Sequence, residues 1–282
     1  MHIKQVMSGA VAAVVMSIGM PLSALAASST VTVTQQNQQG WSTADTRTGG
    51  TISFIKDSTS PAPSGALQLR TDATTTSKAQ YLHAANVPLT DVNSLSYYTK
   101  NISLTRADAD PSYQLPTCLL GLDAPKTEKN PIGCNGFTTF VFEPYQNGTV
   151  MSNDWQNWNV LNGQLWSSRT VGSGTCQTVN GAGGPPFYSL AAIKTSCPKA
   201  VVVGFGVNIG SNNPNFTVET DLVNFNGTSY DFQFTKVPTD KEQCKKDGYQ
   251  NFTDEVGADF KNQGSCVSYA NSQDSADAKL EF

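Results

Sequence analysis

The chain has 282 residues, a formal net charge of −4 and a sequence pI of about 5.1. This acidic balance offers no basic surface of the kind that a phosphate backbone requires, so nucleic acid is not an expected partner. An aromatic content of 9% excludes a chain that is disordered throughout.

The first 26 residues have the layout of a secretory signal peptide. The sequence MHIKQVMSGAVAAVVMSIGMPLSALA has a short basic start, an apolar stretch and a small-x-small ending at Ala24-Leu25-Ala26. A serine, a glycine and a proline interrupt the apolar stretch, which is shorter than the ~20 residues of a bilayer-spanning helix. We therefore expect cleavage near Ala26-Ala27, a secreted, extracellular protein and no membrane span after cleavage. A retained N-terminal anchor is the alternative.

Short segments that alternate apolar and polar residues recur along the rest of the chain. They are TVTV, TISFIK, ALQLRT, LSYYTK, FTTFVFEPY, VVVGFGVNI and YDFQF, and clusters of Gly, Pro, Asn and Asp separate them. Period-two alternation in short segments is typical of half-buried strands. The pattern predicts an all-β protein, an antiparallel β-sandwich of the jelly-roll-like kind. One short helix is expected at SLAAIKTSCP, capped by Ser189 and ended by Pro198.

The composition changes near Pro238, where charged residues become denser. The sequence PTDKEQCKKDG predicts a helix that starts at Pro238 and Thr239, has Glu242 as the partner in a capping box and ends at Gly248. A second short helical turn is expected around Cys266. The predicted parts are a signal peptide (1–26), a β-sandwich domain (28–235), a small helical disulfide-closed segment (236–270) and a flexible tail (271–282).

The six cysteines all follow the signal peptide, and export makes disulfides the default. Six cysteines allow 15 pairings, but neighbours along the chain form three groups. The expected pairs are Cys118 with Cys134, Cys176 with Cys197, and Cys244 with Cys266. Each would close a loop of about 15 to 25 residues and contribute on the order of 3 kcal/mol.

The segment NDWQNWNVLNGQLWSSRT (153–170) carries three of the four tryptophans around Asn162-Gly163. Asn-Gly favours a type I′ hairpin because both central positions need positive φ. In that register one face carries Trp158, Val160 and Leu165, which suits the core. The opposite face carries Trp155, Asn157, Asn159, Gln164 and Trp166.

Two indoles about 13 Å apart among amide side chains suit sugar rings, because pyranose faces stack on aromatics and amides bond the hydroxyls. We therefore expect a non-catalytic protein that binds a glycan or a cell-surface polymer of the envelope through this face. The alternative is that the tryptophans lie under a neighbouring loop and the protein has a structural or interaction role. The sequence does not specify an oligomeric state.

A second Asn-Gly pair, Asn226-Gly227, predicts a hairpin between the last two strands. In its register Glu219 and Asp221 fall on the apolar side, where unpaired carboxylates are costly. A bulge between 220 and 223 is the favoured solution, and the alternatives are a cation such as calcium or hydrogen bonds that hold both carboxylates. No other cofactor is expected.

Two further patterns leave alternatives open. Gly204 and Gly206 leave one side of a strand bare, which permits a loop or ligand to approach or simply allows dense packing. DADPS at 108–112 suits a metal loop or an ordinary turn.

An enzyme is the alternative function, and the sequence leans against it. His83 is the single histidine after the signal peptide and no GxSxG is present, which excludes a serine triad. A glycosidase needs two carboxylates across a cleft, for which Glu143, Asp154, Glu219 and Asp221 are the candidates. A lyase would need a basic or tyrosine cluster. Its candidates are Tyr97, Tyr98, His83 and Lys100.

Three stretches resemble known kinds of protein. FGVNIGSNNPNFTVETDLVNFNG resembles the closing hairpin of jelly-roll modules of the carbohydrate-binding or lectin-like kind. KEQCKKDGYQNF and FKNQGSCVSY (241–269) resemble a terminal segment of bacterial secreted proteins of unknown function, KxQCKxxGWxxF...FKNQGxCV, with Tyr249 in place of its tryptophan. The stretch from Trp41 to Tyr98 resembles uncharacterised exported β-proteins. These resemblances imply a secreted β-scaffold and supply no catalytic residues.

Overall fold

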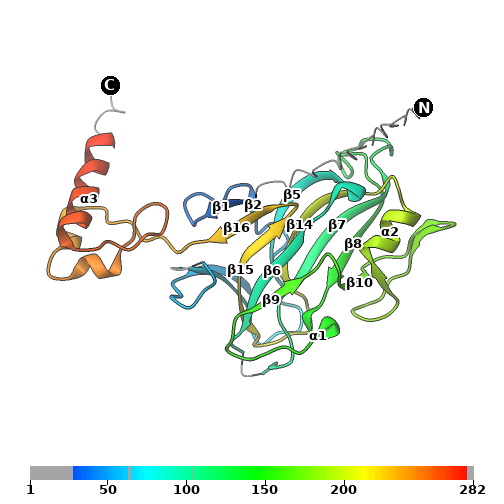
Figure 1. Cartoon of the computed structure of the whole chain (residues 1–282), viewed down its shortest axis with the longest axis horizontal. Helices are drawn as coiled ribbons and strands as arrows, with labels where there is room; N and C mark the ends of the chain where they lie inside the picture. Colours follow the sequence, from blue (N-terminus) through cyan, green and yellow to red (C-terminus); the bar gives the residue numbers. More distant parts are fainter. Residues whose placement is uncertain (1–27, 63–64, 104, 278–282) are drawn as a thin grey trace, which may run out of the picture.

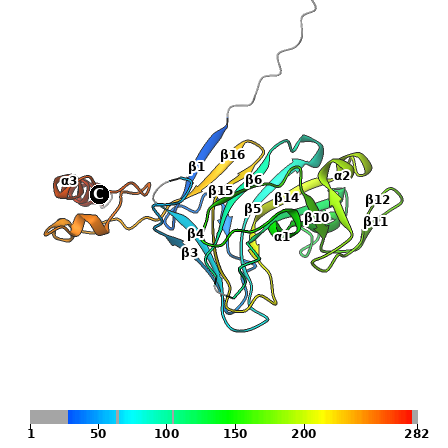
Figure 2. The same ribbon diagram turned by 60° about the horizontal axis from the view of Figure 1, so that its bottom comes forward.

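The computed structural model describes residues 28–62, 65–103 and 105–277. The signal peptide expected at 1–26 lies outside these residues. Two β-sheets pack face to face, and a small C-terminal module (236–277) lies at one end of them (Figures 1 and 2). None of the described helices is long and apolar enough to span a bilayer.

The first sheet has seven strands arranged around one long central strand. Its strands are β1 (Ser29–Val33), β3 (Gly50–Ile55), β4 (Ala66–Thr71), β6 (Leu95–Asn101), β9 (Gln156–Asn159), β15 (Thr217–Phe225) and β16 (Thr228–Phe232). The central strand β15 pairs with β6 along one edge and with β4 and β16 along the other. All pairs are antiparallel except β1 with β16.

The second sheet is a fully antiparallel set with the order β13-β10-β8-β7-β14-β5-β2. Its strands are β2 (Trp41–Ser42), β5 (Ala79–Pro88), β7 (Ser112–Gly121), β8 (Asn135–Phe142), β10 (Gln164–Ser167), β13 (Phe187–Ser189) and β14 (Val201–Ile209). A separate ribbon joins β11 (Val171–Ser173) and β12 (Cys176–Thr178). The helices are α1 (Pro144–Asn147), α2 (Leu190–Ser196) and α3 (Gln263–Asp277), with 3₁₀-helices η1 (Leu89–Asp91), η2 (Lys241–Cys244) and η3 (Gly248–Asn251).

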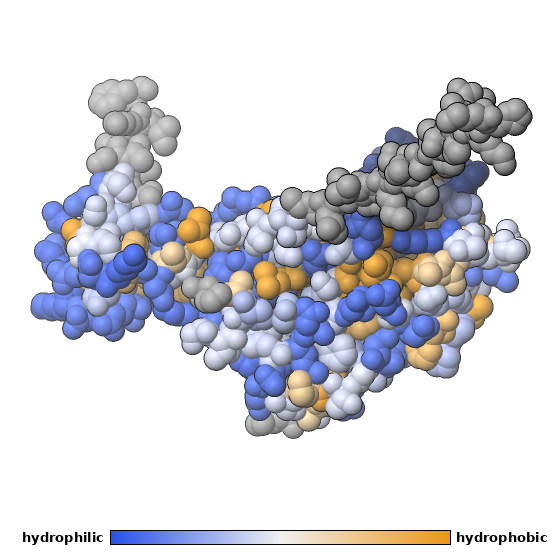
Figure 3. Space-filling view, viewed as in Figure 1, coloured by the Kyte–Doolittle hydropathy of each residue, from blue (hydrophilic) through white to orange (hydrophobic). Residues whose placement is uncertain are grey.

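The core lies between the sheets and is rich in aromatic side chains. Trp41 stacks on Tyr81 with ring centroids 5.1 Å apart. Trp158 is 8% exposed and donates its indole N–H to Thr99 Oγ1 at 2.8 Å, so this indole lies in the core as its strand's alternation predicts. The protein is therefore an all-β, antiparallel, jelly-roll-like β-sandwich, as expected. Apolar residues gather in patches over the sandwich surface, whereas the C-terminal module presents mostly hydrophilic residues (Figure 3).

The hairpin predicted at Asn226-Gly227 is confirmed. These two residues have φ of 53° and 90°, and Phe225 pairs with Thr228 across a two-residue loop. Positive φ at both central positions is the mark of a type I′ turn.

The bulge predicted between 220 and 223 is also confirmed. The register of β15 against β6 shifts between Asp221 and Asn224, and Leu222 has φ of 47°. The extra residue shifts the alternation of side chains between the two faces of β15 by one position. Val218 and Val223 therefore both reach the core, while Asp221 points away from it.

The hairpin predicted at Asn162-Gly163 is wrong. β9 pairs with β6 in the first sheet, whereas β10 pairs with β8 and β13 in the second, and neither central residue has positive φ. The chain crosses between sheets because Val160 is fully buried and donates its backbone N–H to Leu95 O at 3.0 Å. Asn147 exchanges two side-chain hydrogen bonds with the backbone of Gln164, at 2.7 and 3.0 Å, in the place of a hairpin partner.

All three predicted disulfides are present: Cys118–Cys134, Cys176–Cys197 and Cys244–Cys266. The helix expected at SLAAIKTSCP is α2, and Ser189 Oγ accepts the backbone N–H of Ala192 at 3.2 Å. This cap confirms the predicted helix start.

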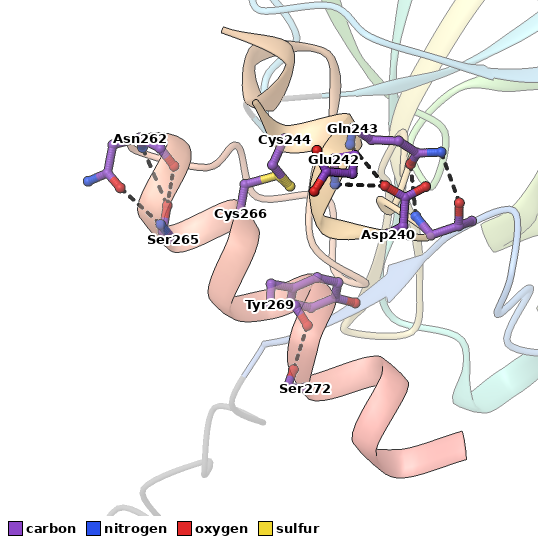
Figure 4. Close-up of a disulfide and its surroundings, with 10 residues drawn as sticks. Asp240, Glu242, Gln243, Cys244, Asn262, Ser265, Cys266, Tyr269 and Ser272 are labelled. Carbon is purple, nitrogen blue, oxygen red and sulfur yellow. Dashed lines mark hydrogen bonds between the residues drawn. A yellow bond between two sulfur atoms is a disulfide. The ribbon is translucent and has the colours of Figure 1, made fainter. Parts of the chain in front are cut away.

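The C-terminal module differs from its prediction in detail. Asp240, rather than Thr239, caps the first helical segment by accepting the backbone N–H groups of Glu242 and Gln243 (Figure 4). This segment is the single 3₁₀ turn η2 instead of an α-helix, because Thr239 is engaged with the Gln243 side chain. The disulfide between Cys244 and Cys266 joins η2 to α3. Helix α3 is longer than the short helical turn expected around Cys266.

Among the described residues, one ion pair links the module to the end of the sandwich. Within the module, Lys236 and Thr253 exchange hydrogen bonds at 2.9 and 3.0 Å. Lys56 of the sandwich pairs with Asp259 at 2.8 Å, with both side chains about half exposed. Such an exposed pair contributes about 0 to 1 kcal/mol, so most of the module's stability comes from its own disulfide and small core.

Candidate functional site

A groove crosses the outer face of the second sheet and has a volume of about 750 Å³. It runs over β10, β8, β7, β14 and β5. Neighbouring strands lie about 4.8 Å apart, so these five strands span roughly 19 Å. This is the size of a ligand site and is long enough for several sugar units.

The floor of the groove includes a row of buried polar side chains. Strand register places Gln80, Asn208 and Ser112 next to one another on β5, β14 and β7, and none is more than 6% exposed. Asn208 Nδ2 donates to Gln80 Oε1 at 3.0 Å, and Gln114 Nε2 donates to Ser112 Oγ at 2.7 Å. These hydrogen bonds fix the orientation of the amides, whose remaining donors and acceptors can meet ligand hydroxyls.

A second row runs beside the first and crosses six strands. In register order it contains Leu82, Gly206, Gln114, Val141, Trp166 and Phe187. Gly206 is required by its surroundings, since a Cβ there would lie 2.2 Å from the carbonyl oxygen of Tyr81. The bare position therefore allows β14 and β5 to approach closely, which is the dense-packing alternative for this glycine.

Three aromatic side chains stand along the β8 and β10 side of the groove. Trp166 is half-buried and donates its indole N–H to Glu143 Oε1 at 3.4 Å. Tyr145 is 44% exposed and Phe137 is 37% exposed, and the guanidinium of Arg169 lies 5.2 Å from the Phe137 ring centroid. Exposed rings of this kind offer flat apolar surfaces to a ligand.

Two carboxyl groups, Asp110 and Glu143, line one end of the groove. Both lie at the same edge of the sheet because Asp110 lies two residues before β7, Glu143 directly follows β8, and the two strands are antiparallel. Asp110 Oδ2 accepts a hydrogen bond from Thr99 Oγ1 at 2.6 Å, whereas Oδ1 is buried without a partner in the described chain. Burial raises the pKa of each carboxyl to about 7. Both are therefore partly protonated at neutral pH.

The structure separates the five residues predicted to form one binding face. Of these, Trp166 lines the groove, and Gln164 lies beside it as an exposed residue of β10. Trp155, Asn157 and Asn159 belong to the first sheet instead, because β9 pairs with β6. The single Trp-Asn face is a wrong prediction, and its cause is the crossing of the chain between sheets.

Trp155 lies in a set of charged residues on the outer face of the first sheet. Its indole N–H donates to Asp57 Oδ2 at 3.3 Å, and Lys100 Nζ lies 5.7 Å from its ring centroid. Lys100 also pairs with Asp57 at 2.8 Å and with Glu219 at 3.5 Å. Burial alone would raise the pKa of Asp57, but the hydrogen bonds from Lys100 and Thr59 lower it. These contacts hold the segment that carries Asp57 and Thr59 against the first sheet.

The candidate catalytic residues are not brought together. Glu143 lies in the groove, whereas Glu219 and Asp221 lie on the outer face of the first sheet. Asp221 is fully buried and accepts the backbone N–H of Phe232 at 2.9 Å. Both candidate calcium ligands, Glu219 and Asp221, thus have other partners, and the described residues contain no group of three or more His, Cys, Asp or Glu arranged to hold a metal. Tyr97 is in the core, and His83 stacks on Phe205.

Sequence reasoning missed the polar floor as part of a site and considered Asp110 only within a possible metal loop at 108–112. The signal for the floor was the alternation in SYQLPT, which places Ser112 and Gln114 opposite the core residues Tyr113 and Leu115. The neighbouring strands that complete the row come from distant segments. Their register is not visible in the sequence.

Comparisons with known proteins show similarity at the level of solved structures. Neither a family model nor a curated protein matches the chain. A family 11 carbohydrate-binding module of a cellulosomal cellulase from Clostridium thermocellum is 11% identical, with a TM-score of 0.36 over 66% of this chain and 86% of that one. Lectin II from Ulex europaeus is 16% identical, with a TM-score of 0.27 over 65% of this chain and 91% of that one. Identities this low assign no function to the chain.

Proposed function

We propose that this protein is a secreted glycan-binding protein and that its binding site is the groove on the second sheet. The observation that supports this most is the position of Trp166 in one cross-strand row with Gln114. An indole offers a stacking surface for the face of a sugar ring, and the adjacent amides match its hydroxyls.

The shape of the groove favours a chain over a small compact ligand. It extends across five strands and about 19 Å, and polar floor residues continue along that length. The three disulfides suit a protein that acts outside the cell, where envelope polymers are available.

A glycan array with the full secreted protein tests this function, followed by retention on the matching insoluble polysaccharide. Trp166→Ala should reduce retention at least about tenfold, since one lost aromatic contact of about 1.4 kcal/mol changes affinity by that factor. Trp155→Ala is the matched control because this tryptophan lies on the other sheet, and it should bind as the wild type does. Unchanged retention of folded Trp166→Ala would overturn the groove as the site.

A second candidate function is cleavage of the bound polysaccharide, and the pair Asp110 and Glu143 favours it. Two carboxyls that titrate near neutral pH at one end of a groove are suited to general acid–base work. Release of new reducing ends from the bound polymer, abolished in Glu143→Gln, would support cleavage. Binding without any release would leave the protein a non-catalytic binder.

A further inference from the structure

The charges that line the groove are unlike the charge of the whole chain. The chain carries a formal net charge of −4. The groove is lined by four cationic side chains, Arg47, Lys78, Arg106 and Arg169, and by three carboxyls, Asp45, Asp110 and Glu143. Formal charge along the groove is therefore slightly positive even with every carboxylate ionised.

Two of the cations lie together at the β5 end, and neither forms an ion pair within the described residues. Arg47 and Lys78 form a backbone bridge, and Arg47 donates its backbone N–H to Lys78 O at 2.9 Å. Across the described chain, the Arg47 guanidinium makes a hydrogen bond to Ser211 Oγ at 3.1 Å but no ion pair, and Lys78 Nζ makes neither. Burial lowers the pKa of Lys78, so an anion beside it would stabilise its charged form.

The carboxyls of the groove offset only part of the positive charge, and the nearest to these cations is Asp45, whose charge favours the charged form of Lys78. Asp45 is exposed and accepts a hydrogen bond from Gln80 at 3.0 Å. Asp110 and Glu143 carry raised pKa values of about 7, so each contributes less than a full negative charge at neutral pH.

We propose that the groove selects anionic glycans, with Arg47 and Lys78 binding the carboxylate or sulfate groups of a chain whose sugar rings lie against Trp166. This proposal rests on glycan binding by the groove. The aromatic side chains stand at the β8 and β10 end, and the two cations stand at the β5 end. A chain laid across the amide floor reaches both.

Binding of matched polysaccharides by isothermal titration calorimetry tests this selectivity. Polygalacturonate and its fully methyl-esterified form share one backbone and differ in charge, and a sulfated galactan separates sulfate from carboxylate as the preferred group. We expect the charged chain to bind at least about tenfold more tightly than its ester, equal to ~1.4 kcal/mol and within the range of one charge-assisted hydrogen bond. Equal binding to single-stranded DNA would indicate a general polyanion effect and overturn the proposal.

Variants that each remove one positive charge test whether Arg47 and Lys78 bind the anionic groups of the chain. Arg47→Gln and Lys78→Gln should each weaken binding of the acidic chain several-fold more than binding of a neutral glycan. Arg70→Gln is the matched control, because Arg70 is an exposed arginine on β4 of the first sheet. If neutral and acidic glycans bind equally through the groove, the selectivity fails while the proposed function stands. If neither kind binds, both fail.

Discussion

Trp166 donates its indole N–H to Glu143, with Nε1 and Oε1 3.4 Å apart, so the aromatic surface of the groove is oriented by a carboxyl whose pKa is about 7. The Trp166 indole, which offers the stacking surface, and the Glu143 carboxyl, which titrates, are therefore held together by a hydrogen bond. Any ligand that lies on the indole also lies close to a charge that changes around neutral pH.

This hydrogen-bonded pair makes anionic-glycan binding pH-dependent. The groups that face Glu143 are Trp166, which donates to it, Arg106, which favours its charged form, and Tyr145 beside it. As the pH falls from 8 to 5.5 the carboxyl is protonated, repulsion of an anionic ligand decreases, and affinity should rise at least about threefold. Calorimetric titration of polygalacturonate across this range measures the change.

The control for this pH effect is Glu143→Gln, which removes one titrating group while keeping an acceptor for the indole N–H. Its profile should be flatter than that of the wild type. An equally steep profile would assign the dependence to Asp110, whose neighbours are Thr99, Trp158 and Tyr97.

Asp110 should also affect stability in a pH-dependent way. Its folded pKa of about 7 lies above the ordinary value of 3.8, so its contribution destabilises the fold progressively as pH rises from about 4 to 7 and stays at that level above. Asp110→Asn should therefore raise the free energy of unfolding at pH 8 by up to about 4 kcal/mol. The gain should vanish near pH 4. Urea denaturation at the two pH values measures it, and a gain that is equal at both would contradict the assignment.

Trp155, which directly precedes β9, and Trp158, which lies within it, should differ in their effect on stability. Trp158 is 8% exposed in the core, so Trp158→Ala should cost about 3 to 5 kcal/mol. Trp155 is half-buried against Lys100 and Asp57, so Trp155→Ala should cost less than half as much. Chemical denaturation compares them. Equal losses would mean that both rings are packed alike.

The C-terminal module should be separable from the groove in its stability. Cys244 and Cys266 are 22 residues apart and join η2 to α3, so replacing both with serine should cost this module about 3 kcal/mol. Limited proteolysis should then cut within 236–277. Glycan binding by the sandwich should persist. Loss of binding would show that the module supports the groove.

The two Asn-Gly pairs show how far local sequence determines this fold. At Asn226-Gly227 both residues adopt positive φ and the predicted hairpin forms. At Asn162-Gly163 the same dipeptide lies in a crossing between sheets, since buried Val160 and the side chain of Asn147 hold the chain by contacts that are distant in sequence. A dipeptide favours a turn, but tertiary contacts decide which strands it joins.

The candidate site shows the same difference between what local sequence determines and what distant contacts determine. Side-chain alternation within each strand predicted correctly that Trp158 faces the core and that Trp166 faces outward. The polar row of Gln80, Asn208 and Ser112 was not predictable, because it forms only when three strands from separate segments take one register. Which face of a strand a side chain occupies is decided locally, whereas the register between strands depends on contacts that are distant in sequence.

The most direct test of the groove as the glycan site is an NMR titration that follows the four tryptophan indole N–H signals, assigned by single Trp→Phe variants. The titrant is the tightest-binding soluble oligosaccharide from the glycan array. The Trp166 signal should shift on binding, while the signals of Trp41, Trp155 and Trp158 stay in place. Movement of the Trp155 signal with Trp166 unchanged would place the ligand on the first sheet and contradict the account.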